Sequence, residues 1–337
     1  MSRRSDFPAF LLVVVIVSLL GLSASTVRAA GNYGEAAPDF PPGAFNDGQR
    51  YQLSDCQGKV AVLFFYEKDC PTCRGKIPER NAIVNQYKGK PVKFFAIAAG
   101  DTLQQAKAYA GGTKLAMPVY ADSLSLMERR YGQTISLQNI YQFRVVGPDG
   151  KISGYTMEPG DIDRALEKAE LKYKPDDYHA KLRPAVELFE WNQYSAGVKA
   201  TRVWLKSTDK EVAASAEKLM AAITEEGKTW LADAEAASGA EPLKAYDLYA
   251  KTSATFGAGD ELGKKATDAM TKLAAADAVK SELEARKMYD RMVNLMAAAA
   301  NPNQRPQLSK AASDIVKKYP DTPTGMKVAE FQKEIGG

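Results

Sequence analysis

The sequence predicts an α/β domain, with a mixed sheet and helices on both faces, followed by an all-α domain. Up to about residue 172, apolar runs typical of buried strands alternate with stretches of helical periodicity. Beyond that point no convincing strand remains, and alanine becomes frequent. A chain of 337 residues is also long enough for two domains.

The N-terminal segment, residues 1–29, has the features of a secretory signal peptide. Arg3 and Arg4 form a basic start, residues 10–22 are uncharged and mostly apolar, and residues 27–29 fit a small-residue cleavage site. The apolar stretch is short for a membrane span, but an uncleaved N-terminal anchor stays open as an alternative. We therefore expect an exported protein, and the bacterial periplasm is the expected location.

The elements of the first domain, residues 35–172, follow from local composition. Strands are expected where β-branched and aromatic residues cluster, and helices where apolar residues recur every three or four positions. The turn at residues 147–150 predicts a β-hairpin, and Asp161 is the expected N-cap of the last helix. The expected strands are 51–53, 60–66, 92–98, 118–121, 143–146 and 152–156, and the expected helices are 73–87, 102–110 (ended by Gly111-Gly112), 124–131 and 161–171.

The motif Cys70-Pro71-Thr72-Cys73 lies between the apolar run 60–66 and the helix expected after it. Unpaired N–H groups and the positive end of the helix dipole at such a turn favour a thiolate over a thiol. The spacing brings Cys73 within reach of Cys70. Cys70 would attack a partner's disulfide, and Cys73 would then resolve the mixed disulfide. Cys70 and Cys73 are therefore the candidate catalytic residues.

Other interpretations of this pair stay open. Half of a zinc site is disfavoured, because the chain contains no second C-x-x-C or C-x-x-H. A permanent structural disulfide would suit an oxidising compartment, and the motif could also be idle. The third cysteine, Cys56, is expected to be a small core-facing residue. No cofactor is predicted.

The charge balance argues against nucleic acid as the main partner. The formal net charge is +4, and it falls to about +2 when the charges of the N-terminal segment are left out. We expect instead protein substrates and a redox partner protein. Apart from the possible N-terminal anchor, no association with a membrane is expected.

Residues 173–183 are expected to form a solvated linker. His179, the only histidine of the chain, lies there beside Asp176 and Asp177. These three side chains could be imagined as metal ligands, but the linker interpretation is favoured. One histidine in a linker also gives no basis for a nucleophilic triad.

Residues 184–337 are expected to be helical, with three copies of a helix–turn–helix. The first helix of each copy ends in an aromatic residue, Trp204, Phe256 or Tyr319, and each turn carries an aspartate. The pattern is similar to tetratricopeptide repeats, whose stacked hairpins offer a concave face to peptides or proteins. A plain helical bundle is the alternative. The expected helices are 184–205, 209–238, 242–256, 261–299, 304–319 and 324–335.

An ordered set of motifs in residues 35–172 resembles the thioredoxin-like superfamily, in its exported TlpA-like and redoxin branch. The resemblance implies a thioredoxin fold with a helix–strand insertion, a nucleophilic Cys70 and a resolving Cys73. The motifs are Ala37-Pro38-Asp39-Phe40, Leu53-Ser54-Asp55, Gly58-Lys59-Val60, Cys70-Pro71-Thr72-Cys73-Arg74 with Pro78, Met117-Pro118-Val119 with Asp122, Tyr131-Gly132, and Val145-Val146 leading to Asp149-Gly150.

The sequence also departs from that family. The position of the family's cis-proline falls near Ile140-Tyr141, where this chain has no proline. Residues 66–69 replace the usual tryptophan, and Lys76 replaces a common acidic residue. A peroxiredoxin-like peroxidase is a further alternative, but Glu67 and Leu63 replace the threonine and proline that those enzymes need.

The sequence therefore predicts an exported thiol–disulfide oxidoreductase with a helical partner-docking domain. The main alternative is a non-catalytic scaffold of thioredoxin fold with a structural disulfide.

Overall fold

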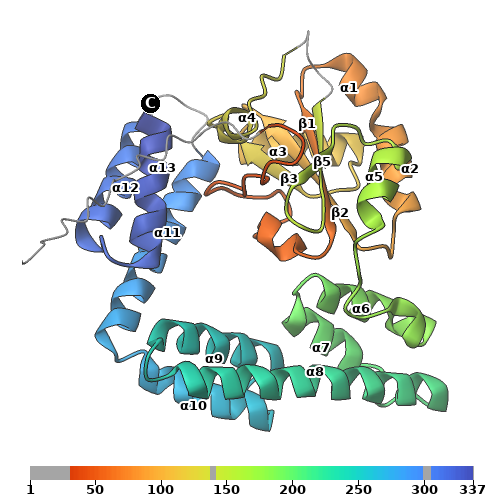
Figure 1. Ribbon diagram of the computed structural model, residues 1–337, viewed down its shortest axis with the longest axis vertical. Helices are drawn as coiled ribbons and strands as arrows, with labels where there is room; N and C mark the ends of the chain where they lie inside the picture. The colour runs from red at the N-terminus through yellow and green to blue at the C-terminus, as the bar shows by residue number, and fades with distance from the viewer. Residues whose placement is uncertain (1–30, 137–141, 299–304, 337) are drawn as a thin grey trace, which may run out of the picture.

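The computed structural model describes residues 31–136, 142–298 and 305–336 (Figure 1). The expected signal segment and the cis-proline position near Ile140-Tyr141 lie outside these residues. Within them, no helix combines the length and apolar character that a membrane span requires.

A five-stranded mixed sheet in the order β3-β2-β1-β4-β5 forms the centre of the first domain. The central strand β1 (Val60–Tyr66) pairs in parallel with β2 (Val92–Ala99) and antiparallel with β4 (Gln142–Val146). β3 (Val119–Asp122) extends the parallel side, and β5 (Ile152–Gly154) forms the expected hairpin with β4. All seven residues of β1 are buried, which explains its uninterrupted apolar sequence.

The two faces of the sheet are covered differently. Alternate side chains of β1 that include Val62, Phe64 and Tyr66 pack with three helices, α2, α3 and α5. The opposite face, with Leu63 and Phe65, packs with α4, the short 3-10 helix η1 and the chain that precedes it. The helices of this domain are α1 (Pro71–Gly75), α2 (Ile77–Gln86), α3 (Leu103–Thr113), α4 (Leu126–Arg130) and α5 (Pro159–Leu166), and η1 is Leu53–Cys56. The expected fold class is confirmed.

The strand expected over residues 51–53 is wrong, because the chain turns into η1 at Leu53. The backbone N–H of Gln52 donates to the Asp55 carboxylate at 3.1 Å, in a capping box that starts the helix. The end expected for the helix over residues 102–110 is also wrong. α3 runs through Gly111-Gly112 and ends at Thr113, and its C-cap, Lys114, has a left-handed backbone with φ of 54°.

The N-cap expected at Asp161 is wrong as well. α5 begins two residues earlier at Pro159, whose fixed φ suits the first helical position, and Glu158 is the N-cap. The Asp161 carboxylate instead accepts the backbone N–H groups of Tyr155 at 3.2 Å and Thr156 at 3.0 Å. It therefore fixes the loop that leads into the helix.

The second domain is all helical, as expected. Its helices are α6 (Arg183–Glu190), α7 (Tyr194–Arg202), α8 (Lys210–Ala237), α9 (Pro242–Phe256), α10 (Glu261–Leu273), α11 (Asp277–Ala298), α12 (Arg305–Lys318) and α13 (Pro323–Gly336). The segment 173–183 is not solvated throughout, because it forms two short 3-10 helices, η2 (Pro175–Asp177) and η3 (Ala180–Leu182). Tyr173 and Leu182 are buried there in the core shared by α6, α7 and α8.

In two of the expected hairpins, α9–α10 and α12–α13, the two helices pack against each other (Figure 1). Asp260 caps α10 by accepting the backbone N–H of Leu262 at 3.0 Å. In the turn between α12 and α13, Thr322 caps α13, since its hydroxyl accepts the backbone N–H of Gly325 at 3.0 Å. A Cβ at Gly325 would lie 1.8 Å from the carbonyl oxygen of Tyr319, so this close approach of two backbones requires glycine.

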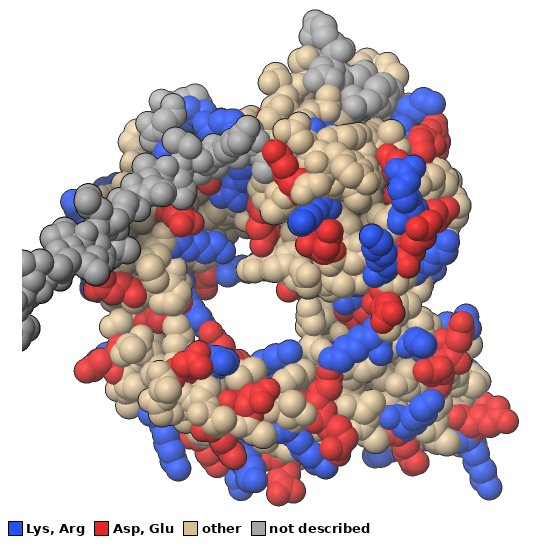
Figure 2. Space-filling model, viewed as in Figure 1, with Lys and Arg blue, Asp and Glu red and all other residues tan. Residues whose placement is uncertain are grey.

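The two domains surround a central opening, which Figure 2 shows plainly. At one contact Lys59, at the start of β1, pairs with Glu190 of α6 at 3.1 Å. At another, Arg130 of α4 makes a bidentate pair with Glu334 of α13, with distances of 2.8–3.2 Å. Arg50 and Asp290 of α11 add a third ion pair at 2.7 Å.

Candidate active site

The cysteine motif follows the central strand at the end of the sheet that faces away from α6 (Figure 1). Cys70 is the N-cap of α1, with an extended backbone, and Pro71 occupies the first helical position. The backbone N–H of Cys73 donates to the Cys70 Sγ at 3.0 Å. The expected strand-to-helix turn, with Cys70 at the start of the first helical turn, is therefore confirmed.

The helix after the motif is broken at Lys76, which ends α1 and also caps α2. Pro78 follows at the second position of α2, where its missing N–H leaves no intrahelical bond unmade. The single helix expected over residues 73–87 is thus two consecutive helices.

The two cysteines are placed for sequential chemistry. The structure records both as thiols, and Cys73 is fully buried. Burial raises the pKa of the Cys73 thiol to about 12, and its hydrogen bond to Cys70 acts in the same direction. The Cys73 thiol therefore keeps its proton at neutral pH.

The cations around the motif differ in their partners. Lys68 pairs with Asp69 and lies 4.0 Å from the Asp101 carboxylate, and Lys76 pairs with Glu79 at 2.7 Å. Arg74 has no carboxylate within 4.0 Å among the described residues. Of the three cations near the motif, Arg74 is therefore the one whose charge no neighbouring carboxylate offsets.

A buried polar cluster lies behind the motif. The hydroxyls of Tyr66 and Tyr109 and one carboxylate oxygen of Asp101 are buried and make no hydrogen bond within the described part of the chain. The two tyrosine rings stack with their centroids 4.5 Å apart, and the Arg74 guanidinium lies 5.7 Å from the Tyr109 ring. Burial raises the pKa of Asp101 to about 6 and that of Tyr109 to about 12.

Asp101 is a member of this cluster that its local sequence does not reveal. It follows β2 directly, as the cysteine motif follows β1, and these two strands are parallel neighbours. The residues after the carboxyl ends of adjacent parallel strands meet at one edge of a sheet. That topological argument is the signal that could have placed Asp101 beside the motif.

The other residues singled out in the sequence do not join this site. Cys56 is buried against the opposite face of the sheet, as expected for a core residue, and burial raises its pKa to about 12. His179 Nδ1 accepts the backbone N–H of Lys181, and Asp176 pairs with Arg183. In the parts of the chain that the structure covers, no group of three or more His, Cys, Asp or Glu residues is arranged to hold a metal ion.

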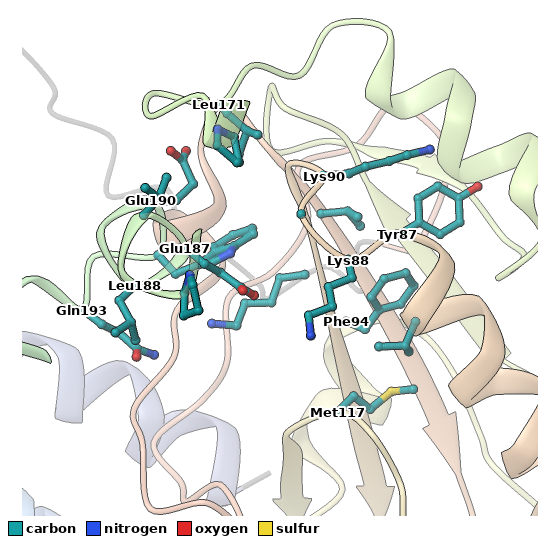
Figure 3. A pocket seen from close by; sticks show the side chains of 18 of the residues that line it. Tyr87, Lys88, Lys90, Phe94, Met117, Leu171, Glu187, Leu188, Glu190 and Gln193 are labelled. Carbon is teal, nitrogen blue, oxygen red and sulfur yellow. The ribbon is translucent and has the colours of Figure 1, made fainter. Parts of the chain in front are cut away.

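A cavity of about 510 Å³ lies between the first domain and α6 (Figure 3). Apolar side chains such as Phe94 and Met117 form one wall, and Lys88 and Glu187 extend toward the space between the domains. The cavity adjoins the first residue of β2, Val92. It is therefore at the end of the sheet opposite the cysteines and is separate from the redox site.

Comparisons with known proteins concern the first domain. The Redoxin family profile matches residues 32–172. The thiol-disulfide oxidoreductase ResA of Oceanobacillus iheyensis is 26% identical over 106 residues, which are 30% of this chain and 55% of that protein. This chain thus spans about half the length of that curated relative.

Two solved structures illustrate the similarity. A thioredoxin domain of a thiol-disulfide oxidoreductase from Bacteroides vulgatus is 20% identical, covers 41% of this chain and 96% of its own, and has a TM-score of 0.35. A thiol:disulfide interchange protein from Chlorobium tepidum is 25% identical, covers 42% and 97%, and has a TM-score of 0.33. The family match and the sheet described above cover the same segment: residues 32–172 match the Redoxin family and have a thioredoxin-like fold.

Proposed function

We propose that this protein is an exported thiol–disulfide oxidoreductase that acts on protein substrates through Cys70 and Cys73. The observation that carries the proposal is the 3.0 Å hydrogen bond from the Cys73 N–H to the Cys70 Sγ at the start of α1. That donor stabilises negative charge on Cys70, both before attack and when Cys70 is the leaving group. The redoxin family match supports the same chemistry.

The reaction has two steps. The Cys70 thiolate attacks one sulfur of a substrate disulfide, whose S–S bond breaks as the first substrate thiolate leaves. Cys73 then loses its proton and attacks the Cys70 Sγ, which releases the second substrate thiolate and forms the Cys70–Cys73 disulfide. Two electrons pass from the protein to the substrate, and the substrate thiolates take up two protons.

The same steps in reverse oxidise a substrate dithiol. Turnover in the reducing direction needs a dithiol partner protein that reduces the Cys70–Cys73 disulfide, and turnover in the oxidising direction needs a disulfide partner. The reduction potential of the pair decides the direction. The signal-like segment at residues 1–29 supports a location outside the cytoplasm, such as the periplasm.

The helical domain is proposed to hold protein partners near the motif. α4 follows β3 at the same end of the sheet as the cysteines, and α11, α12 and α13 share an apolar core with its Leu126. Leu295 of α11 and Met326 of α13 are exposed. Exposed apolar side chains of this kind suit contacts with a polypeptide partner.

The main alternative is a scaffold whose cysteine pair does no chemistry. One observation favours it: Cys70 is only 2% exposed, so a substrate disulfide must displace part of the surface to reach its sulfur. The exposed side chains of Pro71 and Thr72 lie directly beside it and form the surface that a substrate would meet first.

Insulin reduction in the presence of dithiothreitol separates the two functions. The wild type is expected to accelerate insulin precipitation, and Cys70→Ser is expected to fall to the uncatalysed rate. Cys56→Ser is the matched control, because Cys56 lies on the other face of the sheet, and it is expected to keep full activity. Equal background rates for wild type and Cys70→Ser would refute the enzymatic function and leave the scaffold.

A further inference from the structure

A second cavity, of about 700 Å³, lies where the two domains meet. Its walls come from residues 49–56 of the redoxin domain, the α6–α7 turn at residues 191–196, and part of α9. These elements border the central opening of the molecule (Figures 1 and 2). The cavity is therefore built jointly by both domains.

Two lysines from different domains enter this cavity over aromatic rings. The Lys93 Nζ lies 4.3 Å from the ring centroid of Tyr51 and 5.0 Å from that of Trp191. The Lys251 Nζ lies 3.9 Å from the ring centroid of Trp230 and 4.7 Å from that of Tyr194. Such rings attract the ammonium groups and fix their positions.

Neither lysine has a carboxylate within 4.0 Å in the described part of the chain. Partial burial lowers the pKa of both Lys93 and Lys251, although the Lys251 residue as a whole is exposed and Lys93 is half-buried. Loss of water costs each charge free energy, and at Lys93 the nearby charges of Asp47, Asp55 and Glu187 offset part of that cost. The aromatic contacts offset only part of that cost.

The acidic residue of the cavity wall, Asp55, is already engaged by the backbone. Its carboxylate accepts the N–H of Gln52 in the capping box that starts η1. The third cation of the wall, Arg50, pairs with Asp290 of α11. With Arg50 paired, Lys93 and Lys251 face only the Asp55 carboxylate in the wall, so the cavity keeps one more positive than negative charge.

We propose that this cavity binds a small organic polyanion whose carboxylate or phosphate groups pair with Lys93 and Lys251. Its volume lies in the range of small-molecule sites. The side-chain amide of Gln193 in the wall supplies hydrogen bonds to ligand oxygens, and the aromatic rings contact the apolar part of the ligand. The site is at the opposite end of β2 from the redox motif, so it does not depend on the proposed redox activity.

Isothermal titration calorimetry of the full chain at low ionic strength tests the proposal, with citrate and tripolyphosphate as probes. Saturable binding of at least one anion is expected, and sucrose is expected to show none. Lys93→Gln and Lys251→Gln should each weaken binding about tenfold or more, whereas Lys251→Arg should retain it because the charge remains. Lys265→Gln is the matched control, since it removes one exposed lysine from α10, outside the cavity.

The probe that binds with the higher affinity shows which groups the site prefers: carboxylates if it is citrate, phosphates if it is tripolyphosphate. Absence of binding by both anions would overturn the proposal, and so would equal weakening by Lys265→Gln and the two cavity variants. Thermal midpoints confirm that each variant is folded. Because insulin reduction by the lysine variants should remain at the wild-type rate, failure of the anion site and failure of the redox function are distinguishable.

Discussion

We expect ionised Asp101 to lower the stability of the folded protein at neutral pH, and Asp101→Asn to stabilise it. Burial raises the pKa of this carboxyl from 3.8 to about 6. A shift of about two units corresponds to about 3 kcal/mol, at about 1.4 kcal/mol per unit. Asparagine keeps the shape of the protonated acid and carries no charge. At pH 7.5 the variant is expected to gain about 2–3 kcal/mol in free energy of unfolding.

The sign of the pH dependence follows from proton binding. Between pH 4 and pH 6 the folded state holds the Asp101 proton more tightly than the unfolded state does, so this contribution to stability falls as pH rises through that window. Below pH 4 the acid is protonated in both states, and wild type and variant should have similar stability. Above pH 6 their difference should be constant.

Thermal melting of the full chain at several pH values measures this difference. A gain of 2–3 kcal/mol raises the melting midpoint by roughly 6–9 °C for a domain of this size. Asp69→Asn is the matched control, because Asp69 contacts the same Lys68 but is largely exposed, and it should give no such gain. If the difference in melting midpoint between wild type and Asp101→Asn were the same at every pH from 4 to 7.5, the reasoning would be refuted.

Two further predictions concern thiol reactivity and a helix turn. Limiting iodoacetamide should label Cys70 before Cys56 and Cys73 in the native protein. The Cys73 N–H stabilises a thiolate at Cys70, whereas the pKa of the Cys56 and Cys73 thiols is raised to about 12. Peptide mass spectrometry gives the order of labelling, and equal labelling of all three cysteines would contradict it. Gly325→Ala should destabilise the α12–α13 hairpin by about 1–3 kcal/mol, because the added Cβ would overlap a backbone oxygen. Gly239→Ala is the control, since a Cβ there meets open space, and it should not destabilise the protein. Hydrogen exchange of the α13 amides should be faster in Gly325→Ala and unchanged in Gly239→Ala.

The strands could be predicted well where burial alone decides them. The run 60–66 is apolar at every position because β1 is covered on both faces. Two of the errors occur where side chains bond to the local backbone. Gln52 and Asp55 turn an expected strand into η1, and Asp161 binds the loop before α5 instead of capping that helix.

The same distinction holds for the sites. Cys70 and Cys73 could be predicted because spacing and flanking elements lie close together in the sequence. Asp101 has no local signature, since its burial depends on the pairing of β1 with β2 and on the position of Tyr109 in α3. Lys93 and Lys251 come from different domains and share a cavity only in the folded chain.

Trapping of a mixed disulfide tests the redox function most directly. Purified Cys73→Ser and Cys70→Ser variants are mixed with native insulin, whose disulfides are intact, and analysed by mass spectrometry without reducing agent. The proposed roles predict that Cys73→Ser accumulates a covalent adduct at Cys70, because the resolving thiol is missing, and that Cys70→Ser forms none. Absence of an adduct at Cys70, or adducts of equal yield in both variants, would contradict the assignment of Cys70 as nucleophile and Cys73 as resolving cysteine.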